Sequence, residues 1–312
     1  MKLAPALVAA AFVAASAAQA ADDASCKTIR LSDPGWTDIT STNAIASTLL
    51  EALGYEPEVK TLSVPIGYEA MKKGEIDVFL GNWMPAQAHF RDDLDAAKAA
   101  EVIGQNLEGA KFTLAVPTAA ATELGVADFK DLAAHADAFD EKIYGIETGA
   151  PANQSLQKMI DADDFGLGKW TLVESGEQAM LAQVTRAEKS GKGIVFLAWA
   201  PHPMNTAHEL TYLAGGDDYF GPDYGGATVW TLARTGWAAS CPNAAQFFKD
   251  LVFDVEMGNQ MMGLILDDGE KPDDAAKKWI GENPGRLDAW LANVTTLDGQ
   301  PGLPAVKAAL GL

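Results

Sequence analysis

Positive charge is scarce in this chain of 312 residues. Lys and Arg together number 23 against 43 Asp and Glu residues, which gives a formal net charge of −20. A surface of this kind repels phosphate, so nucleic acids and anionic membranes are poor partners for it. The same field favours a cationic ligand over an anionic one.

The common catalytic and metal-binding motifs are also missing. The sequence has no G-x-S-x-G, no H-E-x-x-H and no Gly-rich phosphate loop that ends in Lys-Ser or Lys-Thr. The histidines show no metal-ligand spacing with cysteine, and only the last two are close to each other. They are His89, His135, His202 and His208. The sequence therefore predicts a protein that is not an enzyme and that holds no metal or cofactor.

Only the N-terminus carries a long apolar run. Lys2 is followed by apolar residues at 3–15 and by small residues that end at Ala20. This is the pattern of a secretory signal peptide. The run is too short for a membrane anchor, and Asp22 follows almost at once. We expect residues 1–20 to be removed after Ala20 and the mature chain to be exported.

The sequence contains just two cysteines, Cys26 and Cys241. An exported protein matures in an oxidising compartment, so we expect the two to form a disulfide. The bridge would close a loop of 241 − 26 = 215 residues and would bring the start of the mature chain beside the segment around Cys241. Two free buried thiols are the alternative.

Short apolar segments alternate with helical patterns along most of the chain, which predicts an α/β fold with mostly parallel sheets. After residue 242 the pattern is helical. The predicted strands are residues 28–32, 58–62, 77–80, 111–116, 142–146, 171–173, 193–198 and 228–233.

A Cys26–Cys241 bridge would place the first and last thirds of the chain in one body. We therefore expect lobe I to comprise residues 21–111 and 226–312, and lobe II to comprise residues 112–225. Two strand-like crossings, near 111–116 and 225–229, would join them. A hinge of two crossings suits a clamp that closes on a ligand.

Three of the eight tryptophans, Trp36, Trp83 and Trp199, stand at predicted strand ends beside turn residues. Each taken alone would be read as a core residue. Ligands of open α/β sheets bind at the carboxyl ends of strands, however, so the shared position favours a binding role. Indole faces attract a diffuse positive charge, and a desolvated contact contributes about 2 kcal/mol. The pattern predicts an aromatic cage for an organic cation.

Asp38, two residues after Trp36, is the candidate polar anchor. Thr37 or Asp38 could instead cap the helix that begins there. In a cleft, the Asp38 carboxylate would attract a cation, accept a hydroxyl hydrogen bond and repel a carboxylate ligand. That preference would favour choline over glycine betaine.

Several long motifs support this interpretation. They are residues 35–40, 77–85, 106–111, 199–205 and 220–222. Over these segments the chain resembles the glycine betaine/proline betaine substrate-binding family, and within it the periplasmic choline-binding proteins of bacterial choline ABC importers. The resemblance implies a two-lobed type II periplasmic binding protein fold, a monomer, and an ABC permease with its ATPase as partners.

The resemblance also implies four aromatic rings around the trimethylammonium group, with an Asp and an Asn that receive the hydroxyl. Trp36, Trp83, Trp199 and Asp38 match those positions. Two positions depart from the family pattern, as the sequence has Phe112 in place of Tyr and Ala150 in place of Asn. Asn153 could replace the missing amide from one helical turn away, or it could cap the following helix.

Two alternatives keep other functions open. In the first, the same fold and cage bind glycine betaine, trimethylamine N-oxide, carnitine or a sulfonium analogue. In the second, the protein is a secreted choline-ester hydrolase that uses Asp38 and His202.

Overall fold

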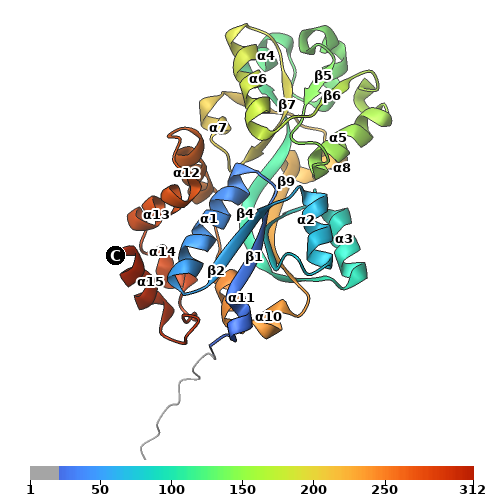
Figure 1. The fold of residues 1–312 in the computed structure, drawn as a ribbon. Coiled ribbons are helices and arrows are strands. Elements are labelled where there is room, and N and C mark those ends of the chain that lie inside the picture. Colours follow the sequence, from blue (N-terminus) through green and yellow to red (C-terminus); the bar gives the residue numbers. More distant parts are fainter. Residues whose placement is uncertain (1–20) are drawn as a thin grey trace, which may run out of the picture.

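The computed structural model describes residues 21–312, so the predicted signal peptide lies outside the described residues. Figure 1 shows two lobes, one above the other, that are joined by long strands. The strands are β1 (Thr28–Asp33), β2 (Glu56–Thr61), β3 (Val78–Met84), β4 (Ala100–Pro117), β5 (Lys142–Tyr144), β6 (Thr171–Val173), β7 (Val195–Ala200), β8 (Leu210–Tyr212) and β9 (Gly226–Arg234).

Helices surround the strands in both lobes. The α-helices are α1 (Thr37–Ala52), α2 (Val64–Lys72), α3 (Ala88–Ala97), α4 (Thr118–Leu124), α5 (Pro151–Asp161), α6 (Glu177–Lys189), α7 (Met204–Ala207), α8 (Asp217–Phe220), α9 (Pro222–Gly225), α10 (Trp237–Ser240), α11 (Pro242–Asp250), α12 (Val255–Leu266), α13 (Pro272–Glu282), α14 (Arg286–Trp290) and α15 (Gly302–Leu310). The 3₁₀ helices are η1 (Ala24–Cys26), η2 (Phe129–Phe139) and η3 (Asp164–Gly166).

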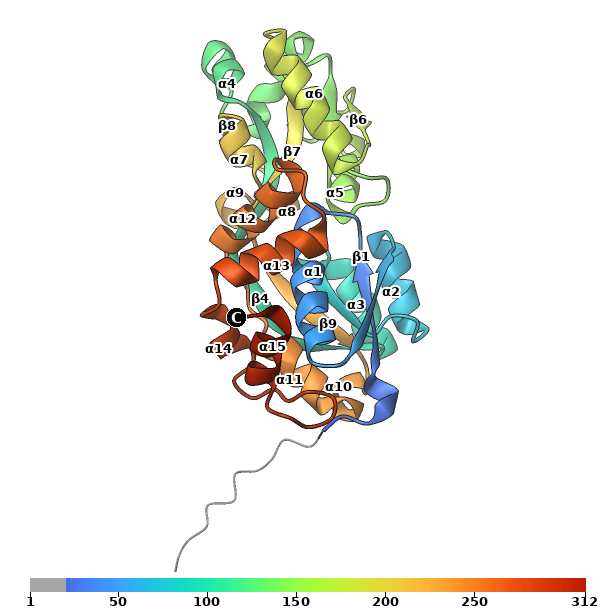
Figure 2. The same cartoon turned by 60° about the vertical axis from the view of Figure 1, so that its left-hand side comes forward.

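The first lobe contains β1, β2 and β3 with α1, α2, α3 and the C-terminal helices, whereas the second lobe contains β5, β6 and β7 with α4, α5 and α6 (Figures 1 and 2). The strand order is β2-β1-β3-β9-β4-β7-β5-β6, and β8 pairs with β4. The pairs β1–β2, β1–β3, β5–β6 and β5–β7 are parallel. Every antiparallel pair includes β4 or β9, the two strands that connect the lobes.

Strand β4 changes partner in the middle of its length. It pairs with β9 as far as Lys111 and with β7 from Lys111 to Ala115. Each predicted strand overlaps an observed one, but β4 begins at Ala100, well before the predicted start at residue 111. Most residues in its first half are only partly buried, so this half lacks the apolar run by which buried strands are recognised.

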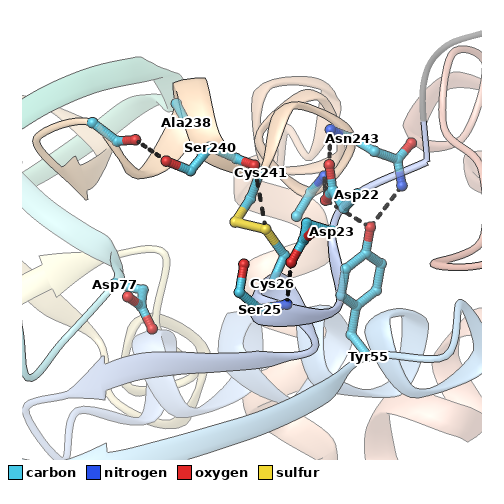
Figure 3. The surroundings of a disulfide bond; sticks show 12 residues. Asp22, Asp23, Ser25, Cys26, Tyr55, Asp77, Ala238, Ser240, Cys241 and Asn243 are labelled. Atoms are coloured by element: carbon cyan, nitrogen blue, oxygen red, sulfur yellow. Dashed lines mark hydrogen bonds between the residues drawn. A yellow bond between two sulfur atoms is a disulfide. The ribbon is translucent and has the colours of Figure 1, made fainter.

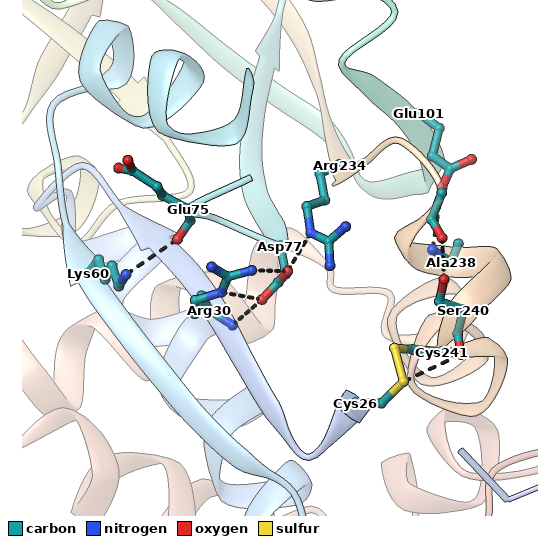
Figure 4. Close-up of polar contacts among 11 residues, drawn as sticks. Cys26, Arg30, Lys60, Glu75, Asp77, Glu101, Arg234, Ala238, Ser240 and Cys241 are labelled. Atoms are coloured by element: carbon teal, nitrogen blue, oxygen red, sulfur yellow. Dashed lines mark hydrogen bonds and ion pairs between the residues drawn. A yellow bond between two sulfur atoms is a disulfide. The ribbon is translucent and has the colours of Figure 1, made fainter. Parts of the chain in front are cut away.

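A buried carboxylate ties three strands of the first lobe together. Asp77, just before β3, accepts hydrogen bonds from Arg30 Nε and Nη2 on β1 and from Arg234 Nε on β9, at 2.6–2.8 Å (Figure 4). Burial raises the pKa of Asp77, but the hydrogen bonds from Arg30 and Arg234 outweigh it and hold that pKa below its usual value. These contacts therefore fix β1, β3 and β9 to one another.

The predicted disulfide between Cys26 and Cys241 is present, with an S–S distance of 2.02 Å and a Cα–Cα distance of 5.7 Å (Figure 3). Beside it, the Asp22 carboxylate accepts the backbone N–H groups of Asn243 and Ala244 at 2.8 and 2.9 Å. These are orphan donors in the first turn of α11, so the start of the described chain completes a distant helix. Within residues 21–312, none of the helices is both long enough and apolar enough to cross a bilayer.

Candidate functional site

One cavity lies where the two lobes meet. Its volume is about 50 Å³, which is room for one small ion or a few water molecules. Its walls come from the β1–α1 turn and β3 on one side, and from β7 and the start of α5 on the other. The lining residues are Trp36, Asp38, Trp83, Ala86, Gln87, Phe112, Ile146, Pro151, Ala152, Leu197 and Trp199.

The three tryptophans occupy strand ends, as the sequence indicated. Trp36 follows the turn after β1, Trp83 is the penultimate residue of β3, and Trp199 is the penultimate residue of β7. The turn before Trp36 requires Gly35, whose φ is 86°, and Asp33 fixes this turn by accepting the Gly35 N–H at 2.7 Å. The indoles therefore reach the cavity from short, well-defined segments.

Phe112 completes the ring of aromatic side chains. It is the direct cross-strand partner of Trp199, so both side chains project from the same face of the sheet. Its ring meets that of Trp83 edge to face, with the centroids 6.3 Å apart, and Phe220 supports it from behind at 5.5 Å. All four cage rings are at least nine-tenths buried. The structure thus brings together the four rings that the sequence predicted as ligand contacts.

Asp38 supplies the charge in this cavity. Its Oδ2 accepts the indole N–H of Trp83 at 3.0 Å, whereas its Oδ1 is buried without a hydrogen-bond partner among the described residues. Burial, followed by the charge of Glu177, raises the pKa of Asp38 to about 7. A buried carboxylate oxygen without a partner is costly, so a cation or a hydroxyl donor in the cavity would stabilise it.

The alternative in which Thr37 or Asp38 caps helix α1 is wrong. Trp36 stands at the N-cap position and makes no side-chain cap hydrogen bond. The Glu177 carboxylate of the second lobe takes that role, because it accepts the Thr37 N–H at 3.0 Å and the Thr37 hydroxyl at 2.6 Å. The cap of α1 therefore comes from the opposite side of the cavity.

His202 holds Glu177 in place. Its Nδ1 accepts the backbone N–H of Met204 at 2.9 Å, so the ring proton lies on Nε2, which donates to Glu177 Oε1 at 3.1 Å. Both ring nitrogens are thus occupied, and His202 is not among the residues that line the cavity. The geometry gives His202 a structural role and brings no Asp38–His202 pair together.

The region of Ala150 and Asn153 differs from the sequence expectations. Ala150 is buried at the N-cap of α5, and Asn153 lies inside that helix and does not cap it. The Asn153 amide donates to the carbonyls of Ile146 and Glu147, and its oxygen accepts the Ile146 N–H. Neither residue lines the cavity, where Pro151 and Ala152 present an apolar wall.

Two carboxylates near the site were not predicted. Glu147 directly follows a predicted strand, so the strand-end position that identified the tryptophans could also have identified it. Glu177 carries no such signal, because its partners Thr37 and His202 lie 140 and 25 residues away. Between residues 21 and 312, no group of three or more His, Cys, Asp or Glu side chains is arranged to hold a metal ion.

The chain is similar to substrate-binding proteins of ABC transporters over most of its length. The family model for the substrate-binding domain of ABC-type glycine betaine transport systems matches residues 27–282. A solved ABC-transporter choline binding protein in complex with choline is 54% identical, with a TM-score of 0.90, over 92% of this chain and 99% of that chain. One in an unliganded semi-closed conformation is also 54% identical, with a TM-score of 0.85, over 92% and 100% of the two chains.

A relative from Listeria monocytogenes is described as a glycine betaine/carnitine transport binding protein. It is 31% identical over 157 residues, which cover 50% of this chain and 51% of the relative.

Proposed function

We propose that this chain, which belongs to the family of substrate-binding domains of ABC-type glycine betaine transport systems, captures choline for an ABC importer. The observation that carries the proposal is Asp38 Oδ1, which has no hydrogen-bond partner within the described chain and lies in a cavity walled by four aromatic rings. The rings would surround the trimethylammonium group through their negative faces. Asp38 Oδ1 would accept the choline hydroxyl.

We further propose that capture occurs by closure of two lobes, with residues 21–111 and 226–312 in one and 112–225 in the other. The partner change of β4 at Lys111 supports a hinge at that point. The higher TM-score to the choline complex than to the semi-closed structure supports a closed conformation here. The mature protein would act as a periplasmic monomer, after cleavage at Ala20, and would deliver its ligand to the permease and ATPase of the importer.

Isothermal titration calorimetry on ligand-free protein tests the proposal. Choline should release heat with a one-to-one stoichiometry at physiological salt and with an affinity in the micromolar range or tighter. Protein that has been shown to be ligand-free and that gives no heat with choline would overturn the assignment.

Glycine betaine is the main alternative ligand, and the structure offers an argument against it. The residues that line the described cavity include no Lys, Arg or His, so a betaine carboxylate would have no cationic partner there. It would also face the Asp38 carboxylate, and like charges in a low-dielectric site repel strongly. The same argument applies to carnitine, which also carries a carboxylate, whereas trimethylamine N-oxide and sulfonium analogues without a carboxylate remain alternatives on the same cage.

Replacing Asp38 with Asn should shift this preference. We expect Asp38→Asn to weaken choline binding by about tenfold or more, because the anionic partner of the cation is lost, and to strengthen glycine betaine binding relative to choline. Competition calorimetry measures the ratio of the two affinities. Asp92→Asn, on the exposed surface of α3, makes the same charge change and should leave the ratio unaltered. An unchanged ratio in Asp38→Asn would contradict the repulsion argument.

The pH dependence of binding follows from the same carboxylate. A quaternary ammonium ion does not titrate, so a change in affinity between pH 5.5 and 8.5 reports on the protein. Asp38 has a raised pKa of about 7 and is neutral below it. Choline affinity should therefore be constant above about pH 8 and fall with pH, by at most tenfold per unit.

Stability should change in the opposite sense in the ligand-free protein. A raised carboxyl pKa contributes stability at low pH that is lost as the pH rises through about 7. Calorimetric titrations and thermal melts across this range measure both effects, and Asp38→Asn should reduce both. A choline affinity that does not change from pH 8 to pH 6 in the wild type would show that Asp38 does not contact the cation.

A further inference from the structure

Glu147 makes a contact across the cavity that the aromatic cage alone does not require. It lies in the second lobe, between β5 and α5, and both of its carboxylate oxygens lie 2.9 Å from Nε1 of Trp36 in the first lobe. The indole N–H therefore points at the centre of a carboxylate. This contact can form only when the two lobes are together.

The loop around Glu147 is built to hold that carboxylate in position. The Asn153 side chain bonds to Ile146 and to the carbonyl oxygen of Glu147, and it also donates to Glu174 Oε1 at 2.9 Å. Gly145 must lack a side chain, because a Cβ there would lie 2.3 Å from the oxygen of Asn153. The Asn153 amide, which does not line the cavity, thus fixes the backbone that carries Glu147.

A carboxylate that accepts an indole N–H also alters the ring. The hydrogen bond is charge-assisted, and the negative charge lies near the ring edge, so it adds to the negative potential that the ring faces present to a cation. Trp83 has the same arrangement with Asp38. Two of the three cage tryptophans therefore donate their N–H groups to carboxylates, one from each side of the cavity.

We propose, on the basis of the proposed function, that Glu147 is a positioning residue that orients Trp36 and strengthens the attraction of its ring for a quaternary ammonium ion. Because Glu147 and Trp36 belong to different lobes, the contact also couples closure to cation capture. Neutral ligands of the same shape gain from the orientation of Trp36 but not from the charge. Glu147 therefore contributes to the selection of cations over neutral molecules.

The test compares choline with 3,3-dimethylbutan-1-ol, in which a neutral carbon replaces the nitrogen. Glu147→Gln keeps an oxygen that can accept the Trp36 N–H but removes the charge. We expect this variant to bind choline about tenfold more weakly, or about 1.4 kcal/mol, and to bind the neutral alcohol within about twofold of the wild type. Glu147→Ala loses the acceptor as well and should weaken binding of both ligands.

Glu123→Gln is the matched control, because Glu123 is exposed on α4 and the substitution changes the net charge equally. It should bind both ligands as the wild type does. Equal weakening of choline and the neutral alcohol in Glu147→Gln, or no weakening of either, would overturn the electrostatic role of Glu147. A wild-type protein that does not bind choline would instead overturn the proposed function.

Discussion

Replacing Trp83 with Ala is expected to weaken choline binding by at least a hundredfold. The loss of one desolvated ring contact alone removes about 2 kcal/mol, or roughly thirtyfold in affinity. Among residues 21–312, Trp83 also donates the only side-chain hydrogen bond to Asp38 Oδ2. Its ring packs edge to face against that of Phe112, with the centroids 6.3 Å apart. The substitution therefore damages the cage and the anchor together.

Calorimetry with choline measures this loss, and a circular dichroism melt verifies that the variant is folded. Trp83→Phe separates the two contributions, since it keeps a ring face but removes the N–H that Asp38 accepts. We expect its affinity to lie between those of the wild type and Trp83→Ala. A folded Trp83→Ala variant with an affinity within threefold of the wild type would show that choline does not bind against this ring.

Of the substitutions discussed, removal of the disulfide should cause the largest loss in free energy of unfolding. In the chain-entropy model, a bridge that closes a 215-residue loop stabilises the folded state by up to about 5 kcal/mol. The double variant Cys26→Ser, Cys241→Ser should lose up to this amount in free energy of unfolding. The hydrogen bonds of Asp22 to the first turn of α11 remain in the variant and keep the segment docked.

Chemical denaturation of the double variant and the wild type measures this difference. Wild-type protein treated with a reductant should show the same loss. Choline affinity should stay within about threefold of the wild type. The helices α10 and α11, which meet at Cys241, lie at the end of the first lobe that is remote from the second lobe (Figure 1). A free energy of unfolding within 1 kcal/mol of the wild type would contradict the entropic argument.

Features of this protein were predictable from the sequence where a few neighbouring residues encode them. Trp36, Trp83 and Trp199 were identifiable because a strand end and its turn are encoded within a few neighbouring residues. The Cys26–Cys241 pair was identifiable because the sequence contains no other cysteine. Strand β8 has only three residues, all half-buried, and it gave no comparable pattern.

Contacts between the lobes could not be predicted from the sequence. Glu147 lies 111 residues from Trp36, and Glu177 lies 140 residues from Thr37. Such pairs depend on how two separately packed bodies meet, which no local periodicity encodes. Asn153 shows the same limit, because its amide could have capped a helix, reached the ligand or held a loop, and only the three-dimensional arrangement decides among these roles.

The cap of helix α1 by Glu177 has a consequence for release. A helix begins with N–H groups that its own backbone cannot satisfy, and here the first of them, on Thr37, finds its acceptor on the other lobe. If the lobes separate as proposed, this acceptor would withdraw and the first turn of α1 would lose its cap. Asp38 belongs to that same turn. In the proposed clamp, opening would therefore weaken the hold of Asp38 on the ligand and would favour its release.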